Sequence, residues 1–157
     1  METYKLWIIA LSILIFLLLM VFNSRTRIVR TYNRYMKVDN KHNITGKQLA
    51  FFLKDKLELH RLKFALTQRK LGDAYNYKYR TLIMSEAVCN TASLASLTIV
   101  AHELGHAMHT YYSNKNNPHA CADYSIFVAE IASTVNEVLL IKHLLQNAKD
   151  NKLKKYL

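Results

Sequence analysis

The chain has 157 residues, with 22 lysines and arginines, 11 acidic residues and a formal net charge of +11. This length allows one hydrophobic core, and about 130 residues remain for a single domain once the apolar first segment is set aside. The charge could suggest a nucleic-acid partner, but the sequence has no glycine-rich phosphate loop, RNA-binding signature or cysteine-histidine finger. We therefore expect no binding to nucleic acid.

The first segment predicts a transmembrane anchor over residues 1–24. Residues 6–22 are apolar apart from Ser12, and a helix of that length spans about 25 Å, close to the bilayer core of about 30 Å. A cleaved signal peptide is the alternative. The apolar run is longer than the hydrophobic region of such a peptide, and no small-residue cleavage pattern follows it. We expect a single-pass membrane protein.

Basic residues follow the apolar run and predict a juxtamembrane linker over residues 25–44. Among lysines and arginines only Lys5 precedes the run, so the positive-inside rule places the bulk of the chain in the cytoplasm. Cys89 and Cys121 agree with that compartment as free thiols. Attraction to anionic lipid headgroups accounts for this part of the positive charge. The residues concerned are Arg25, Arg27, Arg30, Arg34 and Lys37.

Residues 45–57 predict a short amphipathic helix. Thr45 and Gln48 form a capping-box pattern, and apolar residues recur behind it, with Phe52 among those expected to face inward. A strand candidate comes next. Residues 79–85 predict a second strand, because Asn76 and other turn-forming residues precede them and a helical stretch follows. The sequence thus indicates a small β element between helices.

The run His102-Glu103-Leu104-Gly105-His106 carries the most chemical information in the chain. It lies within residues 93–112, where apolar side chains recur every three or four positions, so we expect a core helix. Positions four apart share a helix face, so both imidazoles can bind one zinc ion while the glutamate lies beside the bound water as a general base. Solvated or core histidines are the alternative interpretation.

Zinc needs a third protein ligand, and several downstream side chains are candidates. His109 shares the stripe of His102 but lies about 10 Å along the helix axis, too far for a common ion. Glu130 and Glu137 fall seven apart on a second predicted helix, residues 124–148, and so share a face. One can bind the metal while the other holds a ligand histidine, and a solvated carboxylate is the alternative for each. The remaining candidates are His119, Cys121 and Asp123.

Residues 102–113 and 122–137 closely resemble the active-site region of oligoendopeptidase F, a family that belongs with thimet oligopeptidase. The resemblance covers residues 98–157. It implies that His102, His106 and Glu130 bind one zinc ion and that Glu103 is the catalytic base. It also implies that Glu137 supports the site as a carboxylate beside a metal-binding side chain.

The front of the chain resembles a different family. Residues 1–107, including the runs 45–46, 70–73, 75–76, 81–86 and 95–97, look like the membrane-anchored neutral zinc metallopeptidases of bacteria. The resemblance to one family gives way to the resemblance to the other near residues 102–106, the zinc motif, so we expect a composite or truncated chain. Oligoendopeptidases continue beyond the position of Leu157 with a later histidine and tyrosines that contact the substrate.

Together these observations predict an α+β, mainly helical fold with a zincin-like, gluzincin-type helix pair, a small β element and one N-terminal transmembrane helix. Residues 45–157 are expected to form the metallopeptidase domain. We expect a membrane-anchored zinc metalloendopeptidase that cleaves peptides or unfolded proteins, with Glu103 passing a proton from the water to the leaving amine. The alternatives are a catalytically inactive zinc-binding fragment or interaction protein at the membrane, and a basic membrane-surface scaffold without metal.

Overall fold

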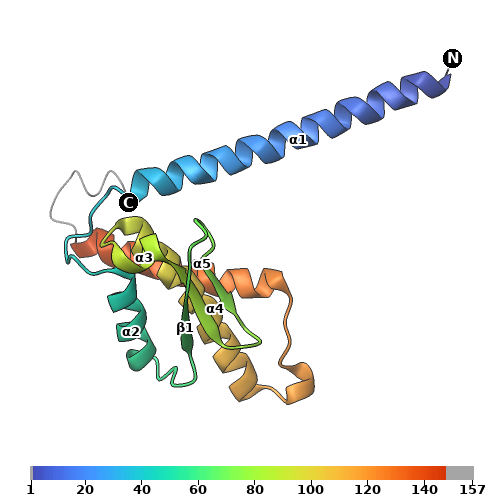
Figure 1. The fold of residues 1–157 in the computed structure, drawn as a ribbon. Coiled ribbons are helices and arrows are strands. Elements are labelled where there is room, and N and C mark those ends of the chain that lie inside the picture. The colour runs from blue at the N-terminus through green and yellow to red at the C-terminus, as the bar shows by residue number, and fades with distance from the viewer. Residues whose placement is uncertain (1, 148–157) are drawn as a thin grey trace. The chain divides into compact units, whose positions relative to one another are not determined.

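The computed structural model describes residues 2–147, which fall into two compact units. The first unit ends at Lys37 and consists of one helix, and the second begins at Val38 and holds every other element (Figure 1). In chain order the elements are α1 (Glu2–Tyr35), α2 (Gly46–Lys56), β1 (Lys63–Thr67), β2 (Ala74–Asn76), β3 (Thr81–Ser85), α3 (Glu86–Asn90), α4 (Leu94–Asn116), the 3-10 helix η1 (His119–Cys121) and α5 (Ile126–Asn147).

Helix α1 is uninterrupted because its sequence contains neither proline nor glycine. The large apolar side chains between residues 6 and 22 are exposed, and the helix is long and apolar enough to cross a membrane. It also continues to Tyr35, so the first part of the predicted linker at residues 25–44 is helical.

Helix α2 begins at the predicted capping box. Gln48 N–H donates to the Thr45 hydroxyl, and the Gln48 side chain accepts from the Thr45 backbone N–H, so both capping bonds are present. The expectation for Phe52 is wrong, because its side chain is exposed, whereas Ala50 is fully buried. Helix α2 packs mainly on α3 and α4, and the face that it buries carries Ala50 rather than Phe52.

A three-stranded sheet follows, in the order β1-β3-β2. Strand β3 is parallel to β1 and antiparallel to β2, which makes β2 an edge strand with Tyr75 opposite Leu82. Leu82 and Met84 of β3 are buried in the core. The predicted strand at residues 79–85 begins only at Thr81, because Arg80 adopts a positive φ of 50° that a strand cannot contain.

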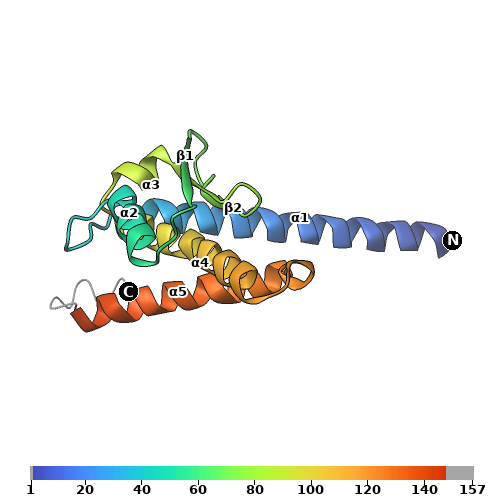
Figure 2. The ribbon, with the colours of Figure 1, turned by 90° about the horizontal axis from the view of Figure 1, so that it is seen from below.

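Helix α4 is the centre of the second unit. Ser93 caps its start by accepting from Ser96 N–H, and the helix runs one turn beyond the predicted residue 112 before Pro118. Leu97, Val100 and Leu104 of this helix are all buried in the core. Figure 2 shows the sheet and the two short helices on one side of α4, with α5 along its other side.

Helix α5 packs on α4 through the face opposite to the one its apolar pattern indicates. Phe127 and Ile131, two of the large apolar side chains that recur along this helix, are 80% and 64% exposed. Ala129 and Ser133 are buried instead. The reason is close helix packing, because a Cβ added at Gly105 would lie only 2.6 Å from the Ser133 Cα atom. Small residues at this crossing bring the polar face of α5 against the zinc motif.

Candidate metal centre

The two histidines of the motif project from α4 toward each other. The Nε2 atoms of His102 and His106 are 3.1 Å apart, and their rings meet edge to face at a centroid distance of 4.8 Å. This follows from the four-residue spacing, since residues separated by one helical turn are neighbours on the surface. Two ring nitrogens therefore converge on one point beside α4.

Helix α5 brings a carboxylate to the same point. The Oε2 atom of Glu130 is 3.6 Å from His102 Nε2, and its Oε1 atom is 3.8 Å from His106 Nε2. One potential ligand atom from each of the three side chains lies within 4.8 Å of the others. The Glu130 side chain is 47% exposed, so the point is open to solvent on one side.

These separations fit a zinc ion. Ligands bound tetrahedrally at about 2.0–2.1 Å stand roughly 3.3 Å from one another. The two Nε2 atoms, 3.1 Å apart, are slightly closer than that, and the two Glu130 oxygens, at 3.6 Å from His102 Nε2 and 3.8 Å from His106 Nε2, are slightly farther. Two imidazoles and one carboxylate are also a donor set that zinc accepts in catalytic sites, where a fourth position stays open for water. The side chains of His102, His106 and Glu130 could thus hold a metal ion.

Glu137 lies on the far side of the first histidine. Its Oε1 atom makes a short contact with His102 Nδ1, and both side chains are 28% exposed. A carboxylate in this position keeps the proton on Nδ1, which leaves the Nε2 lone pair directed at the metal point. Glu137 thus contacts the His102 ring from a position on α5 about two turns beyond Glu130.

Burial tunes two of the titratable groups. It lowers the pKa of His106, and the neighbouring His102 acts in the same direction, so the ligating neutral form persists to lower pH. Burial raises the pKa of the Glu103 carboxyl, while His102 and the Tyr75 backbone N–H oppose that rise. A carboxylate with a raised pKa accepts a proton more readily near neutral pH.

The Tyr75 contact identifies a part of the site that the sequence did not reveal. Its backbone hydrogen bond to Glu103 brings the edge strand β2 beside the motif. Asn136 was missed as well, and its side chain donates to the Ala101 carbonyl in a short contact that ties α5 to α4. Neither residue had a periodic or spacing signal, because β2 has only three residues and a single asparagine on a helix carries no pattern.

The other ligand candidates lie elsewhere. His109 packs its ring on Tyr124 at 4.1 Å, and its Nδ1 atom is buried without a hydrogen-bond partner. His119 and Cys121 are in the exposed η1 segment, and Asp123 follows it, also exposed. Within residues 2–147, none of these four joins a cluster of three side chains able to hold a metal.

Three curated relatives share this region. The chain is 37% identical to Oligopeptidase PepF of Bacillus subtilis over 115 residues, which is 71% of this chain and 17% of that protein. It is 49% identical to an oligoendopeptidase F homolog of Borreliella burgdorferi over 65 residues, 41% of this chain and 11% of the relative. An oligoendopeptidase F homolog from Lactococcus lactis subsp. lactis is 47% identical over 60 residues, which is 38% of this chain and 10% of that relative. The chain thus spans less than a fifth of each of these relatives.

The family comparison covers nearly the whole chain. Residues 8–154 match the family described as "Putative neutral zinc metallopeptidase", so this match runs through the zinc motif and past residue 107, where that resemblance was expected to end. No solved structure matches significantly. The predicted resemblance to zinc metallopeptidases is confirmed, and zinc is the metal that the family implies. The chain belongs to the neutral zinc metallopeptidase family.

Proposed function

We propose that the chain is a membrane-anchored, zinc-dependent metalloendopeptidase with a zincin-like catalytic unit. The observation that carries the proposal is the convergence of His102, His106 and Glu130 within 4.8 Å, beside a partly buried Glu103. In this proposal the three side chains hold one zinc ion. Zinc, when bound, supplies Lewis-acid chemistry to a water molecule and to a peptide carbonyl.

The ligand side chains need defined protonation states. Glu137 accepts a hydrogen bond from the Nδ1–H of His102, which fixes the ring orientation and leaves Nε2 free to bind the metal. Burial keeps His106 neutral for the same purpose. A neutral imidazole is the ligating form, so both effects favour metal binding at neutral pH.

Glu103 is proposed as the general base. It follows His102 directly on α4, and its burial raises the carboxyl pKa toward the range in which a base works near neutral pH. The carboxylate takes a proton from the attacking water and afterwards delivers a proton to the leaving amine. The Tyr75 N–H donates to this carboxylate and holds it in place between these two transfers.

The proposed substrates are peptides or unfolded polypeptides. Strand β2 pairs with β3 along one edge, and its other edge is a position at which an extended peptide can add as a further strand. Because β2 also contacts Glu103 through Tyr75, a peptide bound there would pass the general base. This mode uses backbone hydrogen bonds and therefore tolerates many side chains.

The membrane part of the proposal depends on α1 and its flanking charge. Lys5 precedes the apolar run, and several arginines, beginning with Arg25, follow it. By the positive-inside rule the metallopeptidase unit lies in the cytoplasm. In domain terms, residues 1–24 are the anchor, 25–44 the basic connection, and 45–157 the catalytic unit.

Peptide hydrolysis by the full chain in a neutral detergent tests this function. The parent should cleave a mixed peptide library, and chelation should abolish cleavage until zinc is restored. The Glu103→Gln variant should retain zinc and lose at least a hundredfold in cleavage rate, since general-base catalysis contributes about 10²–10⁴-fold. If this variant cleaves as fast as the parent, the base is misassigned. Zinc without chelator-sensitive cleavage would instead favour a zinc-binding protein that has no turnover.

A further inference from the structure

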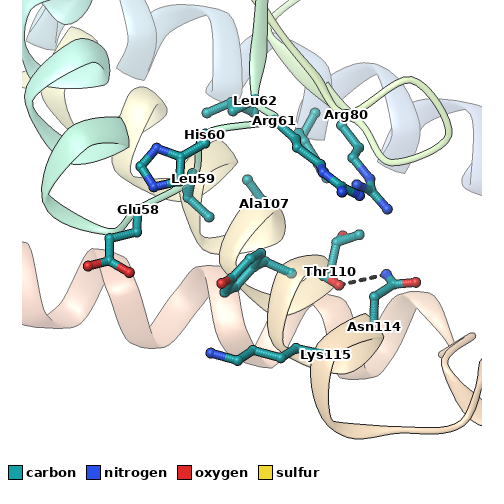
Figure 3. A pocket seen from close by; sticks show the side chains of 12 residues that line it. Glu58, Leu59, His60, Arg61, Leu62, Arg80, Ala107, Thr110, Asn114 and Lys115 are labelled. Atoms are coloured by element: carbon teal, nitrogen blue, oxygen red, sulfur yellow. Dashed lines mark hydrogen bonds between the residues drawn. The ribbon is translucent and has the colours of Figure 1, made fainter.

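A cavity of about 400 Å³ opens beside α4, in the turns that follow the zinc motif. The loop between α2 and β1 forms one wall, Tyr75 of β2 and Arg80 in the turn before β3 form another, and α4 forms the floor (Figure 3). Ala107 and Thr110 lie on that floor. The cavity is distinct from the metal point, because none of its lining residues is one of the three potential ligands.

The helix geometry connects this cavity to the proposed base. Glu103 and Ala107 are four residues apart and share a face of α4, which continues to Tyr111 and Asn114. At 1.5 Å rise per residue, the lining from Ala107 to Asn114 extends from about 6 to about 16 Å beyond Glu103 along the axis. Tyr75 makes the same connection from the sheet, since its backbone contacts Glu103 and its side chain lines the cavity.

The cavity is strongly basic. Arg61, Arg80 and Lys115 line it, and Glu58 is the only acidic residue in the lining. In Figure 3 the two arginine side chains extend toward the same side of the cavity, across from Lys115. Within residues 2–147 neither arginine makes an ion pair with a carboxylate, while the Lys115 ammonium lies 5.6 Å from the Tyr111 ring centroid. Cationic side chains gathered without acidic partners favour an anionic ligand.

We propose that this cavity binds a carboxylate of the peptide substrate, so that peptides with a carboxylate at a set distance from the cut bond are the preferred substrate class. The inference rests on the proposed peptidase function. Guanidinium groups pair with carboxylates through two parallel hydrogen bonds, so Arg61 and Arg80 are suited to this ligand. An extended peptide advances about 3.3–3.6 Å per residue, so the acidic group lies about two to five residues from the bond that is cut. Its source is either an Asp or Glu side chain or the C-terminal carboxylate.

Peptide binding to the zinc-loaded, full-length Glu103→Gln variant tests the inference without turnover. The probes are nine-residue peptides that carry an uncharged fluorophore and a single Glu, scanned through each position. Each probe is compared with two control peptides, one with Gln in place of Glu and one with an amidated C-terminus, and binding is measured by the fluorescence anisotropy of the probe. We expect at least one carboxylate, placed two to five residues from the bond that the parent cleaves, to strengthen binding about tenfold, as for a charge-assisted contact partly open to solvent.

Variants assign the effect to the cavity. Arg61→Gln and Arg80→Gln should each remove most of the preference, and Arg61→Lys should restore part of it. Arg69→Gln removes the same charge from an exposed position outside the cavity and should leave the preference unchanged. Loss on Glu→Gln identifies a side-chain source, and loss on amidation identifies the terminal carboxylate.

Two results would overturn the inference. One is that neither Glu→Gln nor amidation changes affinity by more than twofold. The other is that Arg69→Gln weakens the preference as much as Arg61→Gln, because the effect would then come from overall charge. A different result would count against the peptidase function alone. In that case the parent cleaves none of these peptides in a chelator-sensitive manner, while the carboxylate preference in binding persists.

Discussion

Replacing Gly105 by alanine tests the link between helix packing and metal binding. The added Cβ would lie 2.6 Å from the Ser133 Cα atom and 3.2 Å from the Ala132 carbonyl oxygen, both of them backbone atoms of α5. Carbon atoms in ordinary contact are about 3.5–4.0 Å apart, so the two helices must separate by roughly 1 Å. No side-chain rotation can relieve this contact.

Two opposing effects on stability follow from this substitution. Alanine stabilises a helix interior by about 1 kcal/mol relative to glycine, and overpacking costs about 1–3 kcal/mol. The net change in unfolding free energy should therefore be a loss of between about 0 and 2 kcal/mol. Stability alone does not separate the effects clearly, whereas metal affinity does.

The expected effect on zinc affinity is larger. Glu130 lies one turn before Ser133 and Glu137 one turn after it, so separating the helices displaces both carboxylates. Metal-ligand distances tolerate only about 0.2 Å, and we expect zinc binding to weaken at least tenfold in a competition titration against a chromophoric chelator. Asn116→Ala, an exposed change near the end of α4, should leave affinity unchanged. Unaltered zinc affinity in Gly105→Ala, together with an unfolding free energy raised by about 1 kcal/mol, would refute the packing argument.

Three further predictions concern the supporting residues. Glu137→Gln should weaken zinc binding about 10- to 100-fold in the same titration, since the amide no longer provides a charged acceptor for the metal-binding histidine; equal affinity would contradict its role. Iodoacetamide at pH 8 should modify exposed Cys121 first and Cys89 only after unfolding, because Cys89 is 5% exposed and burial raises its thiol pKa. Because the thiol pKa is raised in the folded state, the contribution of Cys89 to folding stability is fully present below its unfolded-state pKa and is lost as pH rises through its folded-state pKa. Equal labelling of the two cysteines in mass spectrometry would exclude this burial. Asp73→Asn should lower the unfolding free energy by about 1–2 kcal/mol in urea, because Asp73 accepts from both the Ser85 N–H and its hydroxyl at 2.6 and 3.1 Å; an unchanged midpoint would argue against this link.

Local signals in the sequence predicted several elements well. The Thr45 and Gln48 pair identified the start of α2, because capping depends on side chains within three residues of one another. The four-residue spacing of His102 and His106 likewise requires only a helix to bring the rings together. These features are set by short-range geometry.

Features that depend on which surfaces meet were not predictable in the same way. The period of α5 separates an apolar face from a polar one, but it does not say which face contacts α4. In the structure the polar face of α5 contacts α4, through Glu137 and the close approach at Gly105, and Phe127 on the other face is exposed. The basic cavity is another such feature, since Arg61 and Arg80 come from separate loops that only the sheet brings together.

Zinc content of the purified full chain tests the central claim most directly. Elemental analysis should find one zinc ion per chain in the parent, and the loss of that ion in His102→Ala and in Glu130→Ala. Asp123→Ala removes an exposed carboxylate close to α5 and should retain full occupancy. A parent without zinc, or a Glu130→Ala variant that binds it as tightly as the parent does, would contradict a metal centre built from α4 and α5.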